Sequence, residues 1–182
     1  EEIEKEKQQR KGNIIGLDLS LRSTGYAIID SITGSLIDIG EIKTTKEFSD
    51  IETFMYVSKK IIELSRKFNV NYAAVENVYI GHKKTAERLA YLGGSVITTL
   101  LRNIRVKEIS RYAPSQIKKI ITGKGNCKKE DVAFELQKVY PFLRNEYPFS
   151  RKQLKRQNIK KTDDLYDALG VANCLKMEIS NK

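Results

Sequence analysis

The sequence contains no tryptophan, one histidine, two cysteines and three prolines in 182 residues. A zinc site needs a cluster of histidine and cysteine ligands, and neither Cys127 nor Cys174 has a second cysteine at pair spacing or a histidine beside it. Two thiols in a chain of this length also argue against a disulfide framework and are typical of a reducing compartment inside a cell. We therefore interpret both cysteines as packing residues.

Long hydrophobic runs are absent as well. No apolar stretch approaches the roughly 20 residues that span a bilayer, and no secretory signal pattern opens the chain, so we expect no membrane partner. Hydrophobic residues still make up 40% of the sequence, which is enough for the core of one ordinary domain. We expect a charged lead at 1–12 and a single domain at 13–182.

Acidic residues are scarce in two segments of a chain whose net charge is +10. The stretch 115–129 contains five lysines and no acid, and the stretch 144–161 contains seven basic residues against Glu146 alone. A basic domain favours a polyanionic partner, and local clustering of the charge points to nucleic acid. The run at 144–161 is consistent with a solvated loop or with DNA contact, and we favour DNA contact because the whole chain is basic.

Apolar patterns indicate strands first and then an alternation of helices and strands. Runs typical of strands occur at 14–17, 26–29, 36–42, 72–75 and 106–109. Helical spacing of apolar residues occurs at 54–68, 86–100, 117–120, 128–139 and 165–175. The pair Gly93–Gly94 predicts a kink or a close backbone approach in the second helix. This order of elements predicts an α/β fold with a mixed sheet.

Four carboxylates stand where these elements end or begin. Asp18 ends the first strand, Glu76 ends the fourth, and Asp164 and Asp167 share one face at the start of the last helix. A carboxylate at the end of a buried strand is costly unless a cation compensates it, and Mg²⁺ and Mn²⁺ prefer oxygen ligands. Taken singly, each acid also fits an ordinary turn or a first helical turn, and spacing alone does not bring the four together.

Four segments resemble, in order, the motifs of the RuvC family of Holliday-junction resolvases. They are GLDLSLRSTGYAII at 16–29, AAVENVYIG at 73–81, PSQIKKIITGKG at 114–125 and DDLYDALGVANC at 163–174. The resemblance extends from about Asn13 to Leu175. It implies an RNase H-like fold, with a five-stranded mixed β-sheet flanked by α-helices, and a homodimer that cuts four-way DNA junctions.

The resemblance also implies roles for individual residues. Asp18, Glu76, Asp164 and Asp167 match the family's metal-binding, catalytic carboxylates, which would hold Mg²⁺ or Mn²⁺, two ions per active site. Lys118 and Lys129 match lysines implicated in DNA contact and catalysis, and the helix at 86–101 matches the dimer helix. Together with the basic charge of the chain, this gives the expected DNA-binding residues: Tyr79, Lys83, Lys84, Lys118, Lys119, Lys124, Lys128 and Lys129.

Some features depart from the family pattern. Asp163 adds a third acid beside the helical pair, and we prefer Asp164 as a ligand because only Asp164 precedes Asp167 by three residues. The stretch from Tyr140 to Thr162 is longer and more basic than in typical bacterial members, and the charged lead is unusual. For Tyr79, inward packing remains an alternative to stacking on junction bases. These departures predict a divergent member from a phage, plasmid, virus or organelle, acting in a cytoplasm or nucleoid or inside an organelle.

Other functions share part of this pattern. An RNase H-like or RuvC-like ribonuclease acting on structured RNA would use the same carboxylates. An actin-like phosphotransferase is disfavoured because Leu19 and Ser20 replace its glycine-based phosphate turn and the chain is too short for a second lobe. A non-catalytic junction-binding protein would have lost acids, and all four are present.

Overall fold

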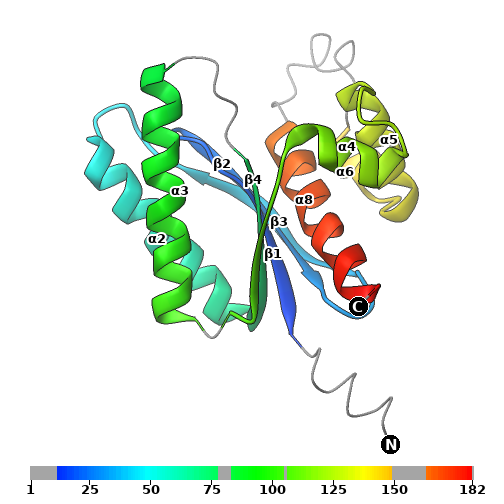
Figure 1. Ribbon diagram of the computed structural model, residues 1–182, viewed down its shortest axis with the longest axis horizontal. Coiled ribbons are helices and arrows are strands. Elements are labelled where there is room, and N and C mark those ends of the chain that lie inside the picture. The colour runs from blue at the N-terminus through cyan, green and yellow to red at the C-terminus, as the bar shows by residue number, and fades with distance from the viewer. Residues whose placement is uncertain (1–11, 78–82, 105, 149–162, 182) are drawn as a thin grey trace, which may run out of the picture.

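The computed structural model describes residues 12–77, 83–104, 106–148 and 163–181, and its strands form one five-stranded sheet in the order β3-β2-β1-β4-β5 (Figure 1). The three strands that open the fold are antiparallel neighbours: β1 (Asn13–Asp18), β2 (Ser23–Asp30) and β3 (Leu36–Lys43). On its other side β1 pairs parallel with β4 (Val70–Glu76), which pairs parallel with β5 (Glu108–Tyr112). The expected α/β fold with a mixed sheet is confirmed.

Helices cover both faces of this sheet (Figure 1). One face carries α2 (Asp50–Lys67) and α3 (Lys83–Asn103), which pack against each other. The other face carries α8 (Asp163–Ser180), and the shorter helices α4 (Pro114–Thr122), α5 (Lys129–Val139) and α6 (Leu143–Glu146) lie beside it. No helix in the described part of the chain is both long and apolar enough to cross a bilayer.

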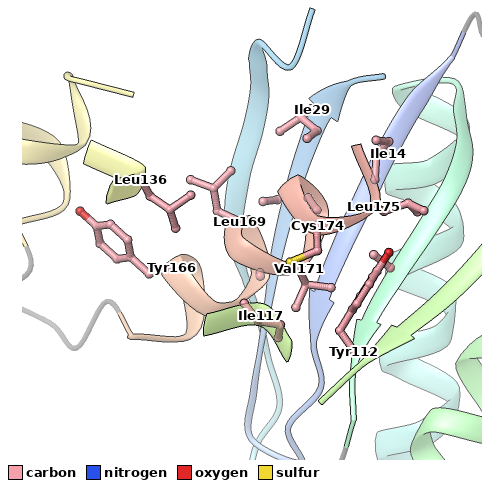
Figure 2. Packing of buried hydrophobic residues seen from close by; sticks show 14 of the residues in the cluster. Ile14, Ile29, Tyr112, Ile117, Leu136, Tyr166, Leu169, Val171, Cys174 and Leu175 are labelled. Carbon is pink, nitrogen blue, oxygen red and sulfur yellow. The ribbon is translucent and has the colours of Figure 1, made fainter. Parts of the chain in front are cut away.

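β1 explains why both faces must be covered. Its side chains alternate between two separate cores, with Ile14 in the core under α8 and Ile15 and Leu17 in the core under α2 and α3. All three are fully buried, so a strand in the middle of the sheet appears as one continuous apolar run. Figure 2 shows the α8 core, where Leu169 and Leu175 pack beside Ile14 and Ile29 of the sheet.

The fifth strand differs from its predicted position. It was expected at 106–109, but pairing with β4 begins at Glu108 and continues to Tyr112, which lies opposite Glu76. Val106 instead donates its amide to the carbonyl of Ile104 in a local turn. The prediction was wrong because β5 is an edge strand whose later residues include exposed Arg111, so the apolar pattern fades before the strand ends.

Two further expectations need correction. The helix α3 is continuous through Gly93 and Gly94. Within the described residues a Cβ added at Gly94 would meet nothing within 4 Å and one at Gly93 only the Leu19 side chain at 3.8 Å, so the expected close backbone approach does not occur there. The short helix α6 lies in a stretch for which no helix was expected. The charged lead, apart from Gly12, and most of the basic run at 144–161 lie outside the described residues.

Candidate active site

The carboxyl ends of β1 and β4 form the base of an acidic cluster. Because these strands are parallel neighbours, Asp18 and Glu76 come to the same edge of the sheet. The first turns of α8 bring Asp167 to that edge. One carboxylate oxygen from each of these three residues lies within 4.8 Å of the other two. All three side chains are partly buried.

Two glycines allow α8 to lie directly on the strands. A Cβ at Gly16 of β1 would come within 2.2 Å of the carbonyl oxygen of Ala168. A Cβ at Gly25 of β2, which pairs with Asp18, would come within 2.2 Å of the carbonyl oxygen of Asp164. Real Cβ atoms do not approach backbone oxygens so closely, so the absence of side chains at these positions sets the depth of α8 and of its acids.

The cluster carries negative charge that the protein compensates only in part. Burial raises the pKa of Asp18 to about 8, and repulsion by Glu76, Asp167 and Asp164 adds to the effect. Burial and the charge of Asp167 likewise raise the pKa of Glu76 to about 7. Carboxyl groups with pKa values raised in this way favour either a proton or a bound cation.

Two lysines from the α4–α5 region reach toward this cluster. Lys129, the first residue of α5, forms a hydrogen-bonded ion pair with Asp167 of α8. Although burial acts the other way, this contact raises the pKa of the Lys129 ammonium. Lys118 of α4 lies close enough for its charge to lower the pKa of Glu76. The cluster therefore has cationic groups on the side that faces α4 and α5.

Asp163 and Asp164 interact with different members of this arrangement. The charge of Asp164 acts on Asp18, whereas that of Asp163 acts on Lys129. The structure thus brings Asp18, Glu76 and Asp167 together within one metal-binding distance, with Asp164 next to them. Neither Asp163 nor Asp164 belongs to the group of three, so the preference for Asp164 as a ligand stays a prediction.

The remaining predicted residues lie farther out. Lys119 of α4, Lys124 of the connecting loop, Lys128 at the start of α5 and Lys84 of α3 are exposed. Tyr79 and the side chain of Lys83 lie outside the described residues. The sequence contained no signal for the direct contact between Lys129 and Asp167, because 38 residues separate the two.

A cavity of about 170 Å³ lies behind Glu76. Its lining includes Leu19 and Val75 from the sheet side, Gly93 and Gly94 from α3, and Arg111 from β5. Sequence reasoning missed this cavity and Arg111, since neither belongs to a recognisable motif.

A five-stranded mixed sheet, with a carboxylate cluster formed by two strand ends and a packed helix, defines the RNase H-like class of nuclease folds. The family model for crossover junction endodeoxyribonuclease RuvC matches residues 14–175. The chain therefore belongs to the RuvC family of crossover junction endodeoxyribonucleases.

Individual relatives are similar over nearly the whole chain. The crossover junction endodeoxyribonuclease RuvC of Ehrlichia canis (strain Jake) is 33% identical over 165 residues, covering 89% of this chain and 94% of the relative. That of Ehrlichia ruminantium (strain Welgevonden) is 30% identical over 170 residues, with the same coverage of 89% and 94%.

Solved structures support the fold. Thermus thermophilus RuvC superposes with a TM-score of 0.71 at 20% identity, covering 93% of this chain and 95% of that one. The same protein in complex with a Holliday junction substrate gives 0.71 at 18% identity, with 93% and 94% coverage. The yeast mitochondrial Holliday junction resolvase gives 0.54 at 13% identity, with 94% and 83% coverage.

Proposed function

We propose that this chain is a metal-dependent, structure-selective endonuclease that resolves four-way DNA junctions by paired phosphodiester hydrolysis. The observation that carries the proposal is the convergence of Asp18, Glu76 and Asp167 within 4.8 Å, bordered by Lys118 and Lys129, in a member of the RuvC family. A relative has been solved with a Holliday junction substrate, which supports junction DNA as the substrate here.

The residues present fit a hard divalent cation. Asp18, Glu76, Asp164 and Asp167 supply only oxygen donors, and their burial and mutual repulsion make a bound cation favourable. We assign them Mg²⁺ or Mn²⁺, two ions per active site. Bound there, the cations would draw charge from the scissile phosphate and favour attack by water.

The lysines act beside these carboxylates. Lys129 holds Asp167 in place, and together with Lys118 it puts positive charge where the scissile phosphate would approach. The proposed DNA-binding set extends outward through Lys84, Lys119, Lys124 and Lys128, whose exposed ammonium groups suit contacts to the phosphate backbone. Tyr79, which is predicted from the family motif, and Lys83, which is predicted from its basic charge, complete the set.

We also propose that α3 is the contact helix of a homodimer. Ala90, Gly94 and Leu101 follow one another at helical spacing and are exposed, so they form a small-residue and apolar seam. Open space beside Gly94 lets a second helix backbone approach closely. A two-fold pair of this kind gives two active sites, as paired nicks require.

A substrate comparison tests the nuclease proposal. The protein is incubated with Mg²⁺ and a four-way DNA junction, linear duplex DNA or structured RNA at one salt concentration, and binding and cleavage are both measured. We expect paired nicks in the junction and little cleavage of the other two. Preferential cleavage of RNA would instead identify a RuvC-like ribonuclease.

The dimer proposal has a matched pair of variants. Leu101 and Tyr91 lie on the same helix and are 61% and 60% exposed, but only Leu101 belongs to the seam. Leu101→Lys should convert the dimer to a monomer in analytical ultracentrifugation, whereas Tyr91→Lys should leave it intact. Equal behaviour of the two variants would exclude this face of α3.

A further inference from the structure

We infer that Arg88 and Asp50 form a positioning pair for the acidic cluster: they fix α3 to the start of α2, and the connection before α2 holds the loop that follows Asp18. The inference rests on the proposed metal-binding role of Asp18. Neither residue contacts the cluster, so both would act through the backbone that carries Asp18.

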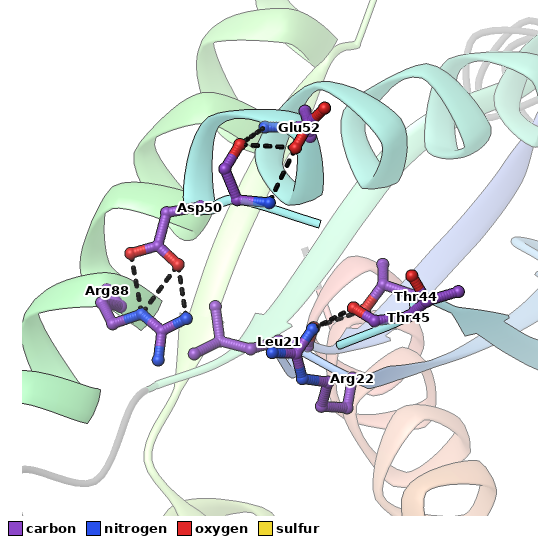
Figure 3. Close-up of polar contacts among 8 residues, drawn as sticks. Leu21, Arg22, Thr44, Thr45, Asp50, Glu52 and Arg88 are labelled. Atoms are coloured by element: carbon purple, nitrogen blue, oxygen red, sulfur yellow. Dashed lines mark hydrogen bonds and ion pairs between the residues drawn. The ribbon is translucent and has the colours of Figure 1, made fainter. Parts of the chain in front are cut away.

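The pair joins two helices through a forked contact (Figure 3). The Nε atom of Arg88 in α3 donates to both carboxylate oxygens of Asp50 in α2, at 2.9 and 2.8 Å, and a terminal nitrogen donates to one of them as well. The hydrogen bond from Arg88 lowers the pKa of Asp50, so this carboxylate stays charged. Among the ion pairs within the described residues, this one and Lys129–Asp167 connect different helices.

Asp50 itself stands in a fixed turn. Ser49 and Glu52 form a capping box, in which the Ser49 amide donates to the Glu52 carboxylate at 2.7 Å and the Glu52 amide donates to the Ser49 hydroxyl at 3.3 Å. The capping box makes residues 49–52 one rigid turn. A change at Asp50 would therefore be passed on to the connection at 44–49, which precedes the helix.

That connection holds the loop after Asp18. The amide of Thr44 donates to the carbonyl of Arg22 at 3.1 Å, and its hydroxyl donates to the carbonyl of Leu21 at 2.6 Å. The Arg22 guanidinium in turn donates to the carbonyl of Thr45 (Figure 3). Three hydrogen bonds thus tie the 20–22 loop to the residues between β3 and α2.

The same loop is anchored by side chains. Leu19 and Leu21 are both buried in the core between the sheet and the helices α2 and α3. The charge of Arg22 also contributes to the low pKa of Asp50, which places the loop and the ion pair in one neighbourhood. The backbone before Asp18 is therefore set by β1. The backbone after it is held by hydrogen bonds between Ser20 and Thr24 and by this α2–α3 assembly.

Loss of the Arg88–Asp50 pair should change the position of the metal ligands more than the stability of the fold. Exposed ion pairs contribute little to folding, and Arg88 and Asp50 are 38% and 41% exposed. Metal ligands, in contrast, tolerate little displacement, because oxygen donors must hold Mg²⁺ at about 2.1 Å. Loss of the pair should therefore weaken metal binding while leaving the fold intact.

The experiment compares Arg88→Met with Lys60→Met. Lys60 also forms an ion pair, with Glu63 at 2.8 Å, but both partners lie on α2, so this pair connects no two elements. Mn²⁺ binding is measured by calorimetry without DNA, and amide hydrogen exchange is followed in residues 19–24. For Arg88→Met we expect a fall of about 3- to 10-fold in Mn²⁺ affinity, below the range for direct ligand supports, faster exchange at 19–24 and an unchanged melting temperature. Lys60→Met should match the unmodified protein.

Two further variants test whether a loss of Mn²⁺ affinity comes from the missing ion pair or from a general disturbance of the fold. Arg88→Lys keeps the charge but loses the fork, so its affinity should be intermediate. The exchanged pair Arg88→Asp with Asp50→Arg should recover most of the affinity. Unchanged Mn²⁺ binding and unchanged exchange in Arg88→Met would overturn the inference. If the unmodified protein and an Asp18→Asn variant bind Mn²⁺ alike, the proposed metal site fails instead, and exchange at 19–24 still decides whether Arg88 holds the loop.

Discussion

Gly25 of β2 supports the backbone of Asp164 in α8 so closely that an added Cβ would lie 2.2 Å from the Asp164 carbonyl oxygen. The site thus depends on a missing side chain as much as on its carboxylates. Since Gly25 also pairs with Asp18 across the strands, this position fixes the spacing between the strand-borne and the helix-borne acids.

Gly25→Ala should therefore push the start of α8 away from the sheet. We expect at least a tenfold loss of Mn²⁺ affinity, comparable to the loss of a direct ligand support, and a free energy of unfolding lower by about 1–3 kcal/mol, as for overpacking. Calorimetry and urea unfolding measure the two effects. Gly93→Ala is the control, because its Cβ would make only an ordinary contact, 3.8 Å from the Leu19 side chain, at a helical position outside the proposed dimer seam, and it should raise stability by up to about 1 kcal/mol. Equal effects of the two substitutions would contradict the close packing at Gly25.

Asp18→Asn should separate cleavage from binding. The amide keeps the shape but removes the charge that holds a cation, so junction cleavage should fall by at least about 10³-fold, as for loss of a main transition-state contact. Binding of the junction depends on the lysines and should change little. Asp30→Asn is the control: Asp30 is the last residue of β2 and accepts hydrogen bonds from Thr33 in the turn that follows. If binding collapsed together with cleavage, Asp18 would have a structural role.

The acidic cluster should also make metal-free stability depend on pH. The pKa values of Asp18 and Glu76 are raised to about 8 and about 7, so between pH 4 and 8 the folded state binds protons more tightly than the unfolded state. The contribution of these two groups to stability is therefore fully present below about pH 4 and is lost as the pH rises to about 8.

Urea unfolding in EDTA measures this slope. From pH 5 to pH 8 we expect the two groups to remove at least about 1 kcal/mol. Addition of Mg²⁺ at pH 8 should restore the loss, because the cation replaces the protons. Asp18→Asn should reduce the slope and be more stable than the unmodified protein at pH 8 without metal. If stability depended on pH equally in both proteins, Asp18 would not be the group whose pKa is raised.

The strand-borne and helix-borne acids of the cluster differ in how far the sequence predicts their positions. Asp18 and Glu76 were predictable, because each ends a short apolar run of the kind that a strand covered on both faces produces. Their convergence with Asp167 was not, because it requires the depth of α8, which Gly16 and Gly25 set through contacts with no periodic pattern.

Long-range pairs were hidden for the same reason. Lys129 and Asp167 are 38 residues apart, as are Asp50 and Arg88, and each side chain taken alone is an ordinary helix charge. The sequence pattern placed β5 two residues too early, because an edge strand needs apolar residues on only part of its length. Element type could be predicted wherever burial imposes a period, and tertiary contacts between polar side chains could not.

Lys118 and its neighbour provide a comparison within one helix. The charge of Lys118 acts on Glu76, whereas Lys119 is exposed and has no such effect on the cluster. Lys118→Ala should reduce the cleavage rate by about 10²-fold, similar to loss of one charge-stabilising donor, and reduce junction binding much less. Lys119→Ala should weaken both slightly and equally. Single-turnover cleavage and equilibrium binding distinguish the two, and an equal loss for Lys118→Ala would make it a plain phosphate contact.

The exposed lysines of the α4–α5 loop should determine the salt dependence of junction binding. Each phosphate contact contributes about −0.9 to the slope of log K against log salt, so the double variant Lys124→Ala with Lys128→Ala should flatten that slope by about 1 to 2. The control removes two charges far from the site: Lys107, which precedes β5, and Lys176, which lies beside Gly34 in the β2–β3 turn. Both double variants have the same net charge, so a difference between them measures local contacts to DNA and not the long-range attraction of the whole protein. Equal flattening by both pairs would mean that the overall charge of the protein, and not the loop between α4 and α5, attracts the DNA.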